Sequence, residues 1–455
     1  MAIRSRWRPT TRAAAVAAVA VLSFTTACAG AGGGGGGDAG AVTIATVANP
    51  QMEDIEKLTR EFEKDHPDTK VRFVTLPENE LRDRVTQDIA TKGGQYDIVT
   101  IGTYETPIWA KNGWLANLDD RASKGDYDVG DLLTPVREAL SYQDNLYAVP
   151  FYGESSFLMY RKDLFDKAGL TMPEKPTWEQ VAGFAKKLHD PKHKLSGICL
   201  RGLPGWGEVL APLNTVILTH GGQWYDENWN AKLTSPETKQ AVQFYVDLVR
   251  DYGEPGAPNA GFSECLTATG QGNAAMWYDA TVAASLLEDP KTSKVAGKMG
   301  YVPAPVAKTE NSGWLWAWSL AIPETSKKQD AAWEFVSWAT SKKYHKLVGE
   351  KLGWSRVPPG ARQSTYDLPE YQKAAGAFAG PTLESIENVN VKQPGMHPQP
   401  WVGVQYVAIP EFQDLGTKVS QEISAAIAGR QTVDEALTKA QRYAEATAKE
   451  GDYQK

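Results

Sequence analysis

The chain has 455 residues, of which 42% are hydrophobic and 23% are charged. This composition can bury sizeable cores and excludes disordered and collagen-like chains. The chain has 48 Lys and Arg against 55 Asp and Glu, a formal net charge of -7. Nucleic-acid binding needs clustered basic side chains that neutralise phosphates, so we expect no nucleic-acid partner. The 15 Trp outnumber the 12 Phe, an excess of a large amphipathic side chain that calls for an explanation.

The first 28 residues are typical of an exported protein. Four arginines and no acidic residue precede the apolar run 13–24, which is too short to span a bilayer and suits a secretory signal. Small residues and Cys28 follow. This resembles a bacterial lipobox, although Thr25 stands where leucine is usual. We therefore expect a signal peptide over 1–27 and lipidation of Cys28, with a plain signal peptide as the alternative.

A glycine run and two further cysteines follow the predicted signal. Gly32 to Gly37 are unbroken, and with neither a strand before them nor a helix after them they do not suit a nucleotide loop. We interpret 28–41 as the lipidated cysteine and a flexible tether. Lipidation of Cys28 leaves Cys199 and Cys265 for one disulfide. Their spacing alone leaves a bridge and two buried thiols equally open.

The first folded segment alternates strands and helices. Strands are predicted at 42–48, 71–77 and 96–102, and helices at 51–65 and around 81–89. The order β-α-β-α-β with short links predicts a parallel, doubly wound sheet. Ligands of such sheets sit beyond the carboxyl ends of the strands. This directs attention to three segments: Asn49, Pro77 to Asn79 and Thr103 to Thr106.

The rest of the chain continues as mixed α/β. Further strands are predicted within 146–161, at 196–202 and at 273–280, and helices at 178–188, 236–250, 329–340 and 418–448. No hydrophobic run of 18 residues follows the signal, so we expect no transmembrane span.

Catalytic and metal motifs are not recognisable. His189 and His193 have the i,i+4 spacing of a helical metal site, but Pro191 between them would disrupt that helix. No H-E-x-x-H, G-x-S-x-G or Walker loop occurs. We therefore expect no metal, no cofactor and no enzymatic activity. A secreted glycan-processing enzyme stays as an alternative, because its carboxylate pair is defined in space rather than in sequence.

Several segments together resemble one transport family. They are F-E-K-D-H-P at 62–67, Y-D-I-V to L-D-D at 96–120, Y-A-V-P-F-Y to K-A-G-L at 147–170, P-T-W-E-Q at 176–180 and G-Q-G-N-A-A-M-W-Y-D-A at 270–280. The chain resembles the extracytoplasmic solute-binding lipoproteins of carbohydrate ABC transporters, family 1. Y-E-T-P-x-W, G-E-S-S and W-Y-D-A-T look most like the sorbitol and mannitol polyol branch.

The resemblance implies an α/β fold of two discontinuous lobes, of the type II, maltose-binding-protein-like kind, joined by cross-over hinge strands. We expect an N-terminal lobe from 42–150 plus 279–316 and a C-terminal lobe from 151–278 plus 317–455. The implied function is capture of a sugar alcohol or small sugar in the inter-lobe cleft and delivery to the transporter permease. The alternative ligands are another carbohydrate, such as a mono- or disaccharide, and a non-carbohydrate solute such as a cationic amine. The implied setting is a monomer anchored by lipid to the outer face of the cytoplasmic membrane.

Aromatic and charged side chains suit such a ligand, because indole faces take C–H patches and charged groups take adjacent hydroxyls. Trp314, Trp316 and Trp318 alternate as in a strand, which points all three to one face. Packing in the core is the competing interpretation for each. The candidate ligand-binding residues are Tyr104, Glu105, Tyr152, Glu154, Ser155, Arg201, Trp206, Glu208, Trp277, Asp279, Trp316, Trp318, Arg356 and Trp401.

Overall fold

The computed structural model describes residues 40–125 and 127–454. The predicted signal peptide, Cys28 and the glycine run lie outside these residues. None of the helices in the described part is both long and apolar enough for a membrane span.

A five-stranded sheet forms the centre of the first lobe. Its order is β2-β1-β3-β10-β6, and its strands are β1 (Val42–Val47), β2 (Val71–Leu76), β3 (Ile98–Ile101), β6 (Ala148–Glu154) and β10 (Trp316–Ala321). β1 is parallel to β2 and β3, whereas β10 is antiparallel to β3 and β6. The predicted parallel β-α-β-α-β unit is therefore confirmed, and β10 enters the sheet from far along the chain.

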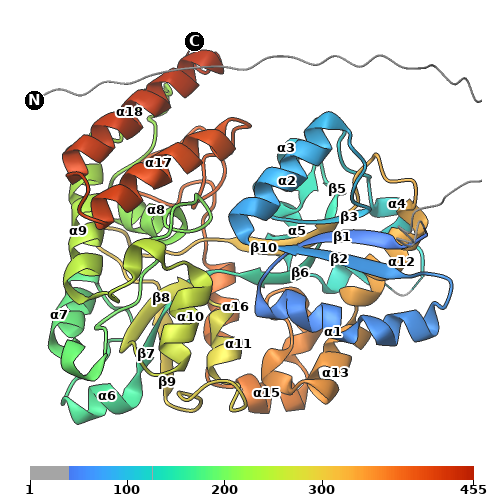
Figure 1. The fold of residues 1–455 in the computed structure, drawn as a ribbon, viewed down its shortest axis with the longest axis horizontal. Coiled ribbons are helices and arrows are strands. Elements are labelled where there is room, and N and C mark those ends of the chain that lie inside the picture. Colours follow the sequence, from blue (N-terminus) through green and yellow to red (C-terminus); the bar gives the residue numbers. More distant parts are fainter. Residues whose placement is uncertain (1–39, 126, 455) are drawn as a thin grey trace, which may run out of the picture. The chain divides into compact units, whose positions relative to one another are not determined.

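Helices cover both faces of this sheet (Figure 1), with α1 on one side and α2 and α3 on the other. The helices of this lobe are α1 (Pro50–Asp65), α2 (Glu78–Thr91), α3 (Glu105–Lys111), α4 (Asp119–Ala122), α5 (Thr134–Ala139), α12 (Gln329–Ala339), α13 (Lys342–Lys351), α14 (Gln363–Tyr366) and α15 (Pro369–Ala375). A short hairpin, β4 (Ser141–Tyr142) and β5 (Asn145–Leu146), leads into β6.

The start of α1 shows how the sequence sets a helix boundary. Asn49 has extended backbone angles, and its side-chain oxygen accepts from the Met52 N–H at 3.2 Å, which satisfies one of the free donors at the helix start. Pro50 follows at the first helical position, where its missing N–H costs nothing. The buried face of the helix then packs the Phe62 ring edge-on against Phe335 of α12. Asn49 therefore begins α1 two residues after the end of β1.

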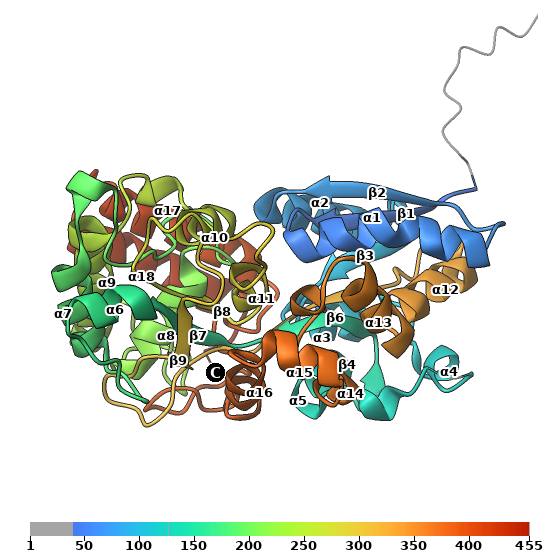
Figure 2. The ribbon, with the colours of Figure 1, turned by 90° about the horizontal axis from the view of Figure 1, so that it is seen from below.

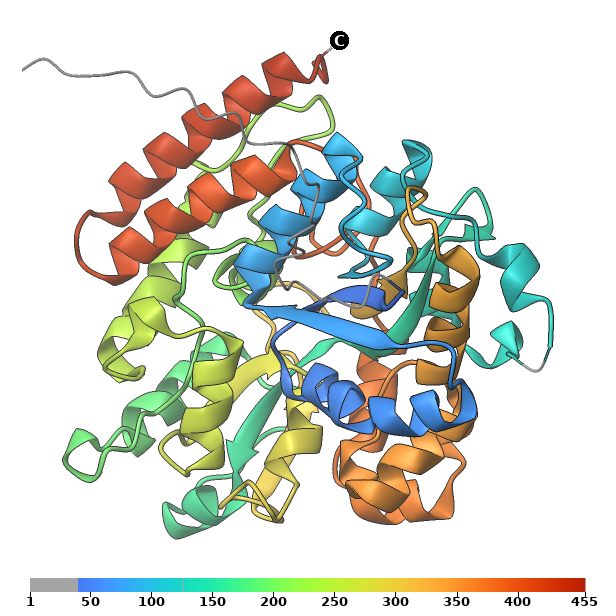
Figure 3. The same ribbon diagram turned by 45° about the vertical axis from the view of Figure 1, so that its right-hand side comes forward.

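The second lobe contains a three-stranded antiparallel sheet of order β8-β7-β9. Its strands are β7 (Ser156–Arg161), β8 (Met276–Ala280) and β9 (Met299–Pro303). Its helices are α6 (Lys162–Lys167), α7 (Trp178–Leu188), α8 (Leu210–Thr219), α9 (Pro236–Tyr252), α10 (Phe262–Gly270), α11 (Ala283–Leu287), α17 (Phe412–Ile427) and α18 (Val433–Glu450). The two long C-terminal helices lie side by side next to α9 (Figure 3).

The chain passes between the two sheets at two closely spaced places. β6 ends at Glu154 and β7 begins at Ser156, so a single residue separates strands of different sheets. The return runs from the end of β9 through 304–315 to β10. Helix α16 (Ala379–Glu387) packs beside β6, β7 and β9 (Figure 2). A third passage runs through α16, from α15 of the first lobe to α17 of the second, and the three passages are the joints between the lobes.

The strand pairing differs from the lobe boundaries that the sequence suggested. Residues 279–316 were expected in the N-terminal lobe, but β9 pairs with β7 in the second sheet. Residues 317–455 were expected in the C-terminal lobe, but β10 pairs with β3 and β6 in the first. The apolar pattern of β10 suits either sheet. Its position is set by long-range pairing, because β10 finds hydrogen-bonding strands on both of its edges only between β3 and β6.

Candidate functional site

A pocket lies where the two lobes face each other beside the passages between the sheets. Together with the adjoining open solvent, its space amounts to about 1040 Å³. Residues of both lobes line it: Val47, Ala48, Asn49, Pro77, Glu78, Arg82, Tyr152, Glu154, Arg201, Leu203, Trp206, Gly207, Glu208, Ala211, Phe262, Ser263, Glu264, Ala280, Val282, Trp314, Trp316, Trp318 and Gln405. The lining therefore combines indole rings with buried charged groups.

The end of β6 and the start of β10 build one wall. Trp316 pairs with Glu154 and Trp318 with Tyr152 in the antiparallel register, and all four side chains line the pocket. Gly102 packs so closely against the Trp316 ring that an added methyl group would collide with it. The absence of a side chain at this position therefore lets the indole lie against the backbone that follows β3.

Arg82 is held in the pocket by two carboxylates. It lies one turn after Glu78 on α2, which starts where β2 ends, and the Glu78 Oε1 accepts from the Arg82 Nε at 3.0 Å and from the Nη2 at 2.8 Å. Glu105 on α3 pairs with the Nη1 and accepts from the Gly102 N–H at 2.9 Å. The Arg82 guanidinium carbon lies 3.9 Å from the Trp206 ring centroid. Arg82 thus joins α2 of the first lobe to an indole of the second.

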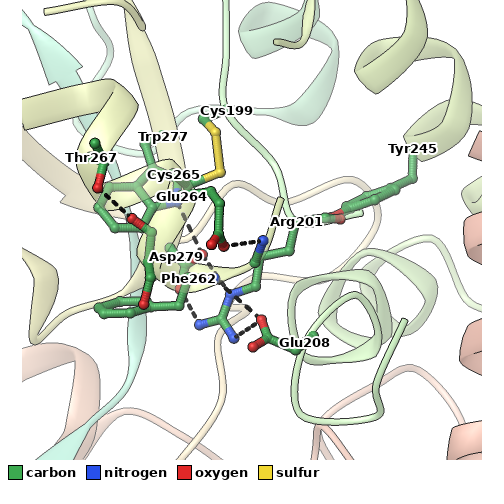
Figure 4. The surroundings of a disulfide bond; sticks show 12 residues. Cys199, Arg201, Glu208, Tyr245, Phe262, Glu264, Cys265, Thr267, Trp277 and Asp279 are labelled. Atoms are coloured by element: carbon green, nitrogen blue, oxygen red, sulfur yellow. Dashed lines mark hydrogen bonds and ion pairs between the residues drawn. A yellow bond between two sulfur atoms is a disulfide. The ribbon is translucent and has the colours of Figure 1, made fainter. Parts of the chain in front are cut away.

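Arg201 occupies the corresponding place in the second lobe (Figure 4). Asp279 on β8 accepts in a bidentate manner, with 2.8 Å from the Arg201 Nε to the Oδ2. The Arg201 Nη1 donates to the Gly207 carbonyl at 2.8 Å and to Glu208 at 3.4 Å. Trp277 donates its indole N–H to the same Asp279 oxygen at 3.0 Å. Asp279 and Trp277 therefore lie behind Arg201 and set its position.

Burial changes the protonation of two pocket acids. It raises the pKa of the Glu154 carboxyl to about 8; Arg201 opposes this rise, and Asp279 and Glu78 add to it. Burial also raises the pKa of Glu208, again against the attraction of Arg201. A buried acid that stays neutral at pH 7 can donate a hydrogen bond as well as accept one.

The structure brings half of the fourteen candidate residues to the pocket wall. These are Tyr152, Glu154, Arg201, Trp206, Glu208, Trp316 and Trp318. Four others stand directly behind that wall. Glu105 and Asp279 hold the two arginines, Trp277 holds Asp279, and the Tyr104 ring packs 5.1 Å from Trp206 while its hydroxyl donates to the Ile409 carbonyl.

The remaining three candidates do not line the pocket. Ser155 is fully buried between β6 and β7, where its N–H donates to Thr281. Trp401 packs against Tyr225 and Trp229 in the second lobe. Arg356 lies in the short 3-10 turn η4 (Trp354–Arg356) and pairs with two aspartates outside the pocket. Local motifs drew attention to these residues, but chain topology placed them elsewhere.

Sequence reasoning missed Arg82, Phe262 and Glu264 as lining residues. Asn49, Pro77 and Glu78 were noted only as the ends of parallel strands, and all three line the pocket. The signal for Arg82 was its i,i+4 spacing from Glu78 immediately after a strand end. Such pairs usually lie on exposed helix faces, so the spacing alone carried little weight.

The two cysteines form a disulfide, which settles the alternative that the sequence left open. Cys265 lies on α10, and Cys199 comes two residues before Arg201. In the described residues, no group of three or more His, Cys, Asp and Glu side chains is arranged to hold a metal ion.

Arg356 connects the two lobes. Asp54 of α1 accepts from its Nη2 at 2.6 Å, and Asp289, which follows α11, accepts from its Nη1 at 3.0 Å. All three side chains are at most 12% exposed. Gln51 of α1 donates to Ser285 of α11 beside them. The contact therefore stabilises the arrangement in which the lobes face each other.

We expect Arg356→Gln to weaken ligand affinity by up to about tenfold without touching the pocket, because a smaller closed population lowers apparent affinity in proportion. Isothermal calorimetry of both proteins measures the change. Arg121→Gln, which removes an Arg–Asp pair within the first lobe, serves as the control. Equal affinities for Arg356→Gln and the unmodified protein would contradict the inter-lobe role.

Two α/β lobes with a polar and aromatic pocket between them define a two-lobed solute-binding protein. The comparisons with known proteins agree. Residues 49–346 match the family described as bacterial extracellular solute-binding proteins. The mannitol-binding protein of Pseudomonas aeruginosa is 46% identical over 415 residues, which cover 91% of this chain and 94% of that protein. The chain belongs to the bacterial extracellular solute-binding protein family, and its place of action is outside the cytoplasm.

Solved structures give the same result. An ABC transporter solute-binding protein from Agrobacterium vitis with bound D-mannitol has 53% identity and a TM-score of 0.90, with 91% of this chain and 100% of that chain covered. A second, from Agrobacterium radiobacter in complex with ribitol, has 27% identity and a TM-score of 0.79, with 90% and 99% covered. The predicted family and the two-lobed α/β fold are confirmed.

Proposed function

We propose that this chain captures a linear sugar alcohol of the D-mannitol type and delivers it to the permease of an ABC importer. The observation that carries the proposal is the near full-length similarity to a mannitol-binding protein and to a structure holding D-mannitol. The relatives reported above are binding proteins of transporters, and the chain's role is binding without covalent change of the ligand.

The chemistry of the pocket supports a polyol. The indoles of Trp206, Trp314, Trp316 and Trp318 offer flat apolar faces to C–H groups. Arg82, Arg201 and the acids beside them offer charge-assisted hydrogen bonds to hydroxyls. Micromolar binding needs about -8 kcal/mol, or roughly -0.7 kcal/mol per heavy atom of a twelve-atom hexitol, which is well within the range of small ligands.

The position of the pocket supports capture by closure. Arg82 comes from the first lobe and Arg201 from the second. A ligand that contacts both binds more tightly when the lobes face each other, and only such differential affinity shifts a conformational equilibrium. The closed monomer then docks on the permease, and a lipid on Cys28 keeps it at the outer face of the cytoplasmic membrane.

A calorimetric screen of D-mannitol, D-sorbitol, ribitol, D-mannose and maltose tests the proposal. We expect a hexitol to bind most tightly. Trp316→Ala is expected to weaken that binding at least tenfold, because it removes a stacking face from the pocket wall. Trp401→Ala removes a buried indole outside the pocket and should leave affinity within about twofold. A screen in which no polyol binds would overturn the proposal.

A further inference from the structure

The buried charges around the pocket are unequally matched. Five carboxylates face two guanidinium groups. Arg82 is shared by Glu78 and Glu105, and Arg201 is shared by Asp279 and Glu208. Within residues 40–125 and 127–454, the Glu154 side chain forms neither an ion pair nor a hydrogen bond.

Glu154 lies where a ligand can reach it. It is the last residue of β6, opposite Trp316 of β10, and it lines the pocket although the residue is only 6% exposed. The Trp314 indole N–H, on the same wall, is close enough to lower the pKa of Glu154 a little, yet it is buried without a hydrogen-bond partner. Burying a polar group without a hydrogen-bond partner lowers the stability of the fold, unless a ligand supplies that partner. Glu154 therefore has capacity for a partner from the pocket.

We propose that Glu154 is a specificity-determining residue, which extends the ligand range of the pocket to polyols that carry a primary amine and rejects polyols that carry a carboxylate. This rests on the proposed function, because it takes a polyol chain as the common part of the ligand. An ammonium group supplies both the charge and the donors that Glu154 lacks. A ligand carboxylate would add a negative group beside two arginines that are already paired with acids of the protein.

Proton release distinguishes the two kinds of ligand. With a pKa of about 8, Glu154 is mostly protonated at pH 7 and can donate to a neutral hydroxyl. An ammonium group stays charged at this pH and favours ionised Glu154, so its binding releases a proton. The charged groups acting on Glu154 are Arg201, Asp279 and Glu78. Glu208, whose pKa burial also raises, is the other acid of the pocket that can release a proton. Because Asp279 and Glu78 are held by arginines, we expect affinity for the amine to rise from pH 6 to pH 8 and then level off.

Calorimetry at pH 7 with three matched ligands tests the proposal: D-mannitol, its analogue with one terminal hydroxyl replaced by an amine, and D-mannonate. We expect the amine to bind at least as tightly as D-mannitol and the acid at least a hundredfold more weakly. Glu154→Gln should weaken amine binding relative to D-mannitol binding at least tenfold and reduce the buffer-dependent heat of proton release. Glu334→Gln removes an exposed carboxylate of α12 outside the pocket, where it accepts from the Thr69 hydroxyl, and it should leave the ratio unchanged.

The outcomes separate this inference from the proposed function. Binding of D-mannitol without binding of the amine would overturn the inference and leave the function intact. Binding of the amine without D-mannitol would support the inference and overturn the function. An amine preference that survives Glu154→Gln, or that Glu334→Gln abolishes equally, would contradict the role of Glu154. If none of the three ligands binds, both proposals fail.

Discussion

Replacing Arg201 with methionine is expected to abolish measurable ligand binding and to lower the free energy of unfolding by about 3–5 kcal/mol. Arg201 lines the pocket, and its side chain is 6% exposed. Its removal leaves Asp279, which is fully buried, and Glu208 without their cation. Methionine has a similar length, so the loss of stability comes from uncompensated charge rather than from a cavity.

A double-mutant cycle with Asp279→Asn separates the two effects of Arg201. The amide introduced by this substitution carries no charge, so the double variant Arg201→Met, Asp279→Asn should recover part of the stability and none of the binding. Urea unfolding followed by circular dichroism measures stability, and calorimetry measures binding. Arg161→Met, which removes an Arg–Asp pair at the end of β7 away from the pocket, is the control. An Arg201→Met protein that binds the hexitol with unchanged affinity would exclude Arg201 from the site.

The excess of tryptophan shows what a sequence can and cannot establish. Trp314, Trp316 and Trp318 alternate in the sequence as in a strand, and all three line the pocket, although only Trp316 and Trp318 lie in β10. Trp401 and Trp277 looked equally suitable, but one packs against other aromatic rings of the second lobe and the other lies behind Arg201. Alternation fixes a shared face, whereas only the fold decides whether that face meets a pocket or a core.

The two arginines show the same limit for charged residues. Arg201 was a candidate because it and Glu208 flank the loop that contains Trp206, whereas Arg82 was not among the candidates. What distinguishes Arg82 is Glu105, which lies 23 positions later and meets it only when α2 and α3 pack on the same face of the sheet.

The predicted lobe boundaries were wrong for a similar reason, because the place of β10 depends on pairing with strands more than 150 residues earlier. Parallel β-α-β order is local and was predicted correctly.

Removal of the disulfide is expected to have the second large effect on stability and binding. Replacing Cys199 and Cys265 together by alanine should lower the free energy of unfolding by about 2–4 kcal/mol, because the bond closes a long loop and so restricts the unfolded chain. The sequence separation is 66 residues. Affinity should also fall, by about threefold to tenfold, because the bond ties the segment carrying Arg201 to α10, which contributes Phe262 and Glu264 to the pocket (Figure 4).

Urea unfolding with and without reductant measures this effect. Reductant should destabilise the unmodified protein to the level of the double variant and should leave the double variant unchanged. Thiol titration of the denatured protein gives the number of free cysteines before and after reduction. The prediction fails if reductant exposes the two thiols and the unfolding midpoint does not move. In that case the second lobe would hold Arg201 and α10 together by packing alone, and the bond would contribute to neither stability nor the geometry of the pocket.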